Sequence, residues 1–179
     1  MLLVYVPKVT SRIRYIFNLL FHDILNVPVQ FTVSKEEFAA FDGAKLVYAK
    51  QTFDSALFFQ SRELLFETGI KEQNISVSEW NGTKMFYATG NNSALPFDPF
   101  AASFYLVSRY EEYLPHIRDV YDRFEAENSI AFQNGFLQQP VINKWALQIG
   151  KLLMTHFPAL QITTPEYKFI STIDIDNAY

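Results

Sequence analysis

Two carboxylates near the end of the chain, Asp174 and Asp176, have the residue types and the spacing that could do chemistry. They follow the apolar, largely β-branched start of Lys168–Tyr179, KFISTIDIDNAY, which predicts a buried strand. Because a strand alternates its faces, two Asp residues spaced by two point the same way. Such a pair can hold a divalent cation or divide the roles of base and ligand. The alternative is a solvated strand end that carries two acids.

A second candidate is a charged cluster at the end of an apolar helix, made of Arg109, Glu111 and Glu112. One interpretation is a polar site at a cleft. The other is that Arg109 pairs with a carboxylate and anchors a neighbouring loop, since charged groups near a core are normally paired. The sequence favours the second interpretation.

A third candidate surrounds the start of the first predicted helix, where basic and hydroxyl side chains gather: Lys8, Thr10, Ser11 and Arg12. Free backbone N–H groups and cations at that place could bind an anion. No glycine-rich phosphate loop accompanies them. A solvated basic edge is therefore the favoured interpretation, and an anion site is the alternative.

The elements that position these residues begin with a strand over Leu2–Val6. A helix follows from Thr10 or Ser11, with apolar residues at i, i+3 and i+4 as far as Leu25, and Val27–Val33 predicts the next strand. A strand, a long helix and a strand over about thirty residues form a βαβ unit with parallel strands.

Further along the chain, capping and turn residues mark the predicted elements. Asp98 caps a helix whose first turns are apolar on every side, so we expect deep burial there, including Phe104, with Pro115 ending the helix. The other predicted elements are a Ser34-capped helix to Phe41, strands at Lys45–Tyr48 and Ala56–Phe59, a short helix at Ser61–Thr68, a hairpin about Asn81 and Gly82, and a helix over Pro140–His156. Together they predict an α/β domain over residues 1–163 with a mainly parallel central sheet, helices on both faces and one β-hairpin.

Composition narrows the function classes. The chain has 179 residues, 49% of them hydrophobic, which is enough for a sizeable core. Its net charge of −4 disfavours nucleic-acid binding, and the lack of cysteine excludes disulfides and thiolate metal sites. No apolar run is long enough for a membrane span or has the form of a signal peptide, so we expect a cytoplasmic location.

The residues Thr172–Asp176, TIDID, resemble the first motif of the polysaccharide deacetylase (NodB-homology) family, usually Thr-Phe-Asp-Asp-Gly. In this chain Ile175 separates the two Asp residues and no Gly follows. Upstream, Pro96–His116 and Val6–Phe17 resemble the N-terminal region of bacterial proteins in which such a catalytic domain follows. The resemblance implies that residues 164–179 are a linker and the first strand of a truncated deacetylase-like domain.

By position, the resemblance makes Asp174 the general base and Asp176 a metal ligand. The family's His-x-x-x-His metal motif has no match in this chain. The resemblance therefore implies a non-catalytic accessory domain without a cofactor of its own. Its partner is a downstream catalytic domain of the same chain, which uses a divalent metal such as zinc to deacetylate a glycan. The alternatives are a stand-alone glycan- or anion-binding module and a protein-interaction domain.

Overall fold

The computed structural model describes residues 1–163 and 166–174. Its strands are β1 (Leu2–Tyr5), β2 (Val29–Thr32), β3 (Lys45–Ala49), β4 (Leu57–Gln60), β5 (Ser78–Trp80) and β6 (Thr83–Met85). Its helices are α1 (Ser11–Phe17), the π-helix η1 (Asn18–Ile24), α2 (Lys35–Ala40), α3 (Pro99–Val107), the 3-10 helices η2 (Tyr110–Tyr113) and η3 (Ala126–Asn128), α4 (Ile130–Gln133) and α5 (Val141–His156).

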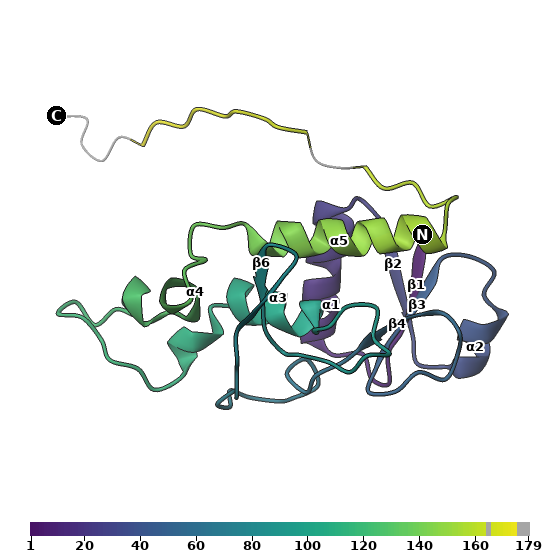
Figure 1. Ribbon diagram of the computed structural model, residues 1–179, viewed down its shortest axis with the longest axis horizontal. Helices are drawn as coiled ribbons and strands as arrows, with labels where there is room; N and C mark the ends of the chain where they lie inside the picture. The colour runs from purple at the N-terminus through teal and green to yellow at the C-terminus, as the bar shows by residue number, and fades with distance from the viewer. Residues whose placement is uncertain (164–165, 175–179) are drawn as a thin grey trace.

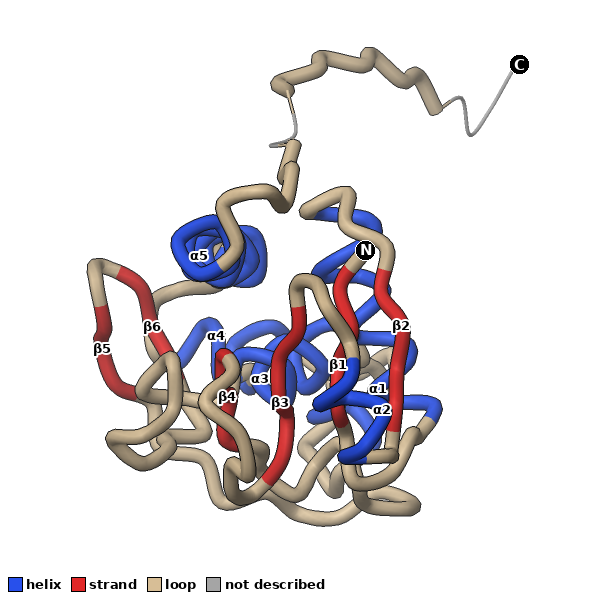
Figure 2. The backbone as a smooth tube through the Cα atoms, turned by 90° about the vertical axis from the view of Figure 1, so that its right-hand side faces the viewer, coloured by secondary structure: helices blue, strands red, loops and turns tan. Residues whose placement is uncertain are grey.

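The centre of the fold is a four-stranded parallel sheet in the order β2-β1-β3-β4. The hairpin β5-β6 lies beyond β4, on the side away from β2 (Figure 2). Its turn has positive φ at both Asn81 and Gly82, as a type I′ hairpin turn requires. The structure confirms the predicted α/β class with its parallel sheet, flanking helices and hairpin.

The two faces of the sheet follow the strand alternation. Leu2, Val4 and Tyr48 face the larger core, which α1, η1, α3 and α5 complete, whereas Leu3 and Val47 face a smaller core with Phe38 of α2. Helix α5 packs on α3, η1 and strand β6 (Figure 1). The sheet is therefore covered on both sides, as a parallel sheet requires.

The first predicted helix changes its winding halfway. It begins as expected, with Thr10 accepting a hydrogen bond from Ile13 N at 3.1 Å. From Asn18 it widens into a π-helix, and Leu25 N donates to Leu20 O, five residues back. Asn26, with φ of 54°, ends it and turns the chain toward β2.

The short helix predicted at Ser61–Thr68 is wrong, because that stretch forms turns only. One turn remains, in which Phe66 N and Glu67 N donate to Glu63 O, whereas Leu64 O and Leu65 O accept from Arg12 and Thr10. Tertiary hydrogen bonds thus use two carbonyls that a longer helix would need.

The helix that begins at Asp98 is shorter than predicted. It ends at Val107, and Arg109 takes a left-handed conformation with φ of 50° before the 3-10 turn η2. This break lets the Tyr110 side chain reach the interior, where its hydroxyl accepts a hydrogen bond from Lys71 N at 2.9 Å. The prediction that Phe104 is deeply buried is also wrong. Its side chain is only partly buried, with the Arg12 guanidinium over its ring.

Phe100 is the residue of α3 at the centre of the larger core. It is fully buried and stacks on Phe17 with ring centroids 4.1 Å apart, and its ring also meets Tyr48 and Phe59. We expect Phe100→Ala to lower the free energy of unfolding by about 3–5 kcal/mol, since it leaves a cavity among packed rings.

The matched variant is Phe104→Ala on the same helix, which should cost no more than about 2 kcal/mol because that side chain is only partly buried. Urea melts of both variants test the placement of α3. Equal losses for the two, or a larger loss for Phe104→Ala, would contradict it.

Candidate functional site

Asp174 lies in an exposed, extended segment that makes no helix or strand over residues 166–174. The strand predicted for Lys168–Ile173 is therefore wrong for this chain. Phe169, Ile170 and Ile173 are 80%, 77% and 84% exposed, because no strand of the described residues lies alongside to bury them. Asp176 lies outside the described residues, so the geometry of the predicted pair does too.

Within the described ranges, no group of three or more His, Cys, Asp or Glu side chains comes close enough to hold a metal ion. Asp174 is exposed. A catalytic cation needs several protein ligands at fixed geometry. The described residues alone therefore do not fit the divalent metal that the deacetylase resemblance implies.

The predicted anion site at the first helix is built largely of groups that bind other parts of the chain. Thr10 Oγ1 donates to Leu65 O at 2.7 Å, and Arg12 donates to Leu64 O at 2.7 Å and to Gly69 O. The Arg12 guanidinium also lies over the Phe104 and Tyr110 rings, at 5.3 and 5.7 Å from their centroids. Lys8 and Ser11 are exposed.

The structure brings together the three residues of the charged cluster. Arg109 pairs with Glu112, three residues later, through Nε and Nη2. Glu111 is the residue that anchors a neighbouring loop, because its carboxylate accepts from Ile130 N at 2.7 Å. Burial raises the pKa of Glu111 above its ordinary value.

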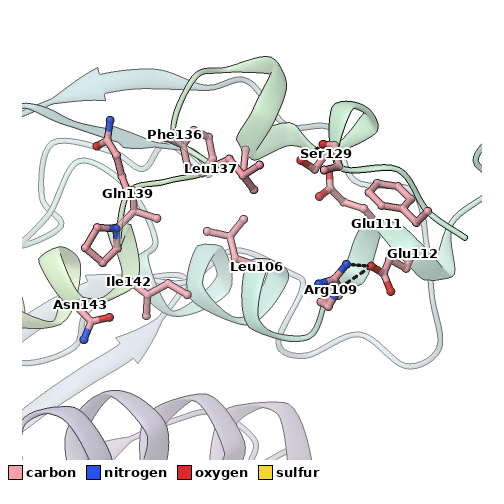
Figure 3. Close-up of a pocket in the computed structure, with 15 residues that line it drawn as sticks. Leu106, Arg109, Glu111, Glu112, Ser129, Phe136, Leu137, Gln139, Ile142 and Asn143 are labelled. Atoms are coloured by element: carbon pink, nitrogen blue, oxygen red, sulfur yellow. Dashed lines mark hydrogen bonds and ion pairs between the residues drawn. The ribbon is translucent and has the colours of Figure 1, made fainter. Parts of the chain in front are cut away.

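Beside this cluster lies a cavity of about 350 Å³ between the end of α3 and the start of α5. Figure 3 shows Leu106 and Ile142 pointing into it opposite Leu137, with the Arg109–Glu112 pair at one end. Gln139 and Asn143 line the other end, and Phe136 is buried at the wall. Its lining suits an apolar group, and the described residues that line it include no paired nucleophile and base. The sequence did not predict this cavity, because its walls come from separate segments between residues 106 and 143.

Among the described carboxyl groups, Asp98 is the one whose pKa the fold shifts most, and it is fully buried. Its Oδ1 accepts from Phe100 N and Ala101 N at 3.0 Å, and its Oδ2 accepts from Tyr48 Oη and Arg62 N at 2.7 Å. Burial raises the pKa of Asp98 to about 6, against the lowering effect of these four hydrogen bonds. The sequence identified Asp98 only as a helix cap and gave no sign of its ties to Tyr48 and Arg62.

Comparisons with known proteins give one match, to a family model described as a family of unknown function (DUF7033), over residues 2–158. No curated protein and no solved structure matches the chain. Over the part of the chain that the structure describes, no helix has the length and apolar character to cross a bilayer.

Asp98 should give the protein a characteristic pH dependence. Its folded pKa of about 6 lies above the ordinary 3.8, so the folded state holds the proton more tightly than the unfolded chain. This group therefore favours folding most below pH 3.8, and its contribution is lost as pH rises from there to about 6, at about 1.4 kcal/mol per pH unit.

The measurement is a series of urea melts from pH 4 to 8 on the wild type and Asp98→Asn. Asn places an N–H₂ group where Oδ2 accepts two hydrogen bonds, so the variant should be less stable by about 1–3 kcal/mol at neutral pH. The free energy of unfolding of the wild type minus that of Asp98→Asn should decrease as the pH rises toward 6. The matched control, Asp42→Asn at an exposed loop position, should keep the wild-type slope. A pH-independent difference for Asp98→Asn would contradict the assignment.

Proposed function

The chain belongs to this family of unknown function, and we propose that it is the non-catalytic N-terminal accessory domain of a longer polysaccharide-deacetylase-like protein. That protein would remove N- or O-acetyl groups from a glycan with the help of a divalent metal. The resemblance of TIDID at Thr172–Asp176 to the first motif of that family supports the proposal. The family match over residues 2–158 ends before the motif, which supports treating the two segments as separate units.

The observation that carries the proposal is the contrast between the domain and the segment after it. The domain packs its own core as far as Leu160 and Ile162, which still contact it. Beyond that point, Phe169, Ile170 and Ile173 are at least 77% exposed. Several large apolar side chains on one short exposed segment are typical of a surface that another part of a protein covers.

Under the proposal, Lys168–Ile173 becomes a strand only when a following domain supplies its neighbours. Neighbouring strands would then pair with both of its hydrogen-bonding edges, and its apolar face would be covered. A lone segment has no such neighbours. Asp174 takes the role of general base and Asp176 that of a metal ligand, as the resemblance implies. The remaining ligands would come from the following domain, since the described residues do not form a metal site.

The first test uses the chain itself. We expect rapid amide exchange from Phe169 through Ile173, because these residues form no ladder. Removal of residues 164–179 should leave the melting temperature within about 2 °C, since residues 166–174 contribute no side chain to the core. Acetate release from an acetylated chitooligosaccharide with zinc or cobalt should equal the metal-only control. Slow exchange in the segment, or a large loss of stability on its removal, would show that it belongs to the domain.

The second test uses a longer protein in which a deacetylase-like domain follows this sequence. Amide exchange at Phe169–Ile173 should slow there by at least about tenfold as the strand forms. Asp174→Asn should lower acetate release by at least about a hundredfold, because the general base is lost. Glu166→Gln, at another exposed acidic position of the same segment, is the matched control and should retain activity. Equal effects of the two variants would sink the assignment of Asp174.

A further inference from the structure

The order of the strands creates a reversal point between β1 and β3. From β1 the chain passes through α1 and η1 to β2 on one side, then through α2 to β3 on the other. Helices α1 and α2 lie on opposite faces, because Phe17 packs in the larger core and Phe38 in the smaller. In open parallel sheets of this kind, ligands bind outside the carboxyl ends of the strands at such a reversal point.

A cavity of about 570 Å³ opens at this place, within the roughly 300–1,000 Å³ typical of small-molecule sites. We call it the switch-point cavity. Its lining residues come from the carboxyl ends of three strands and the segments beside them: Tyr5, Pro7, Lys35, Ala49, Lys50, Gln51, Thr52, Phe53, Ser61, Glu63 and Phe66.

Among the described residues of this lining, Ser61 has the buried side-chain hydroxyl that makes no hydrogen bond. It is only 6% exposed, and its Oγ makes no hydrogen bond within the described part of the chain. Its backbone N–H donates to Ala49 O at 2.9 Å, which fixes it at the ends of β3 and β4. Buried hydroxyl groups normally have a partner, so this unpaired one beside the cavity is free to turn toward a ligand group.

Charge and aromatic rings narrow the ligand further. Lys50 pairs with Glu63 at 2.5 Å, whereas Lys35 Nζ lies 4.9 Å from the centroid of the Phe53 ring. Among the ion pairs of the described residues, none involves Lys35. Two lysines and one glutamate leave this lining with one excess positive charge, and Tyr5 packs edge-on against Phe53 at 4.6 Å. A single anionic group beside a ring-shaped body fits this lining.

A second cavity, of about 770 Å³, shares Lys50, Gln51, Ser61 and Glu63 with the first. Its other walls are mainly polar, with Gln60, Gln73, Asn74 and Asn92 among them. Amide side chains offer both donors and acceptors, which suits hydroxyl groups better than an aromatic body. Ser61 stands where the two spaces meet.

We infer that the switch-point cavity binds a sugar ring that carries one carboxylate or phosphate. The ring lies against Tyr5 and Phe53, Lys35 binds the anionic group, and Ser61 hydrogen-bonds a ring substituent. The sugar's other hydroxyl groups face the amide-lined space. The site is independent of Asp174 and of the deacetylase proposal, because it uses only residues of the folded domain.

Titration of the isotope-labelled protein, followed by amide chemical shifts, tests the site with four probes: glucuronic acid, glucose 6-phosphate, glucose and benzoate. Saturable shifts at Ala49, Lys50 and Ser61 with one or both acidic sugars are the expected result, and the stronger of the two identifies the anionic group. Glucose and benzoate should bind at least about tenfold more weakly, since each lacks one half of the recognition.

Two variants separate recognition from folding. Lys35→Gln should weaken binding of the acidic sugar by about tenfold. Lys71→Gln, at an exposed position outside the cavity, should leave that binding unchanged. Ser61→Ala should weaken binding and leave the melting temperature unchanged or higher, because its hydroxyl has no protein partner to lose. The inference is overturned if no probe shifts the cavity amides, if glucose binds as tightly as the acidic sugars, or if Lys35→Gln and Lys71→Gln behave alike.

Discussion

The buried carboxylate of Asp98 joins three parts of the fold that are distant in sequence. One oxygen caps α3, and the other holds the Tyr48 hydroxyl of β3 and the backbone of Arg62 after β4. These bonds orient α3 against the sheet, so that Phe100 enters the aromatic centre of the larger core. An apolar side chain at this position would need no hydrogen-bond partners, whereas a buried carboxylate does. The four hydrogen bonds that Asp98 accepts offset much of the cost of removing it from water. Tyr48 remains a donor because burial raises its pKa well above the ordinary value.

The sequence predicts elements well wherever a local signal determines them. Ser34 and Asp98 accept the expected capping hydrogen bonds, and Asn81 with Gly82 forms the hairpin turn. It fails where distant groups compete with local ones. Residues 61–68 have helical character, yet Leu64 O and Leu65 O accept hydrogen bonds from Arg12 and Thr10, and no local pattern could reveal those partners. The switch-point cavity was missed for the same reason, because pairing of β1, β3 and β4 assembles its walls.

The terminal segment shows that a strand-like sequence forms a strand only where neighbouring strands pair with it. Phe169, Ile170 and Ile173 have the right types, but no ladder partner lies beside them in the described chain. A β-branched run gains its stability from neighbours, and propensity alone does not supply it. The same limit applies to the charged cluster at the end of α3. The sequence predicts that Arg109 pairs with a carboxylate and anchors a loop; Arg109 does pair with Glu112, but Glu111 anchors the loop. Residue types indicated the interactions, and the tertiary structure selected which residue makes each one.

Helix α5 determines when a newly made chain can complete its core. The four parallel strands end by Gln60, so the sheet can pair while the ribosome is still adding later residues. Trp145, Ile149 and Leu153, however, are fully buried in the same core, and α5 packs on η1 and α3. The apolar surfaces of η1 and α3 therefore stay open to water until His156 has emerged. While the residues between β4 and the end of α5 are being added, this apolar surface is thus open to aggregation and to capture by chaperones.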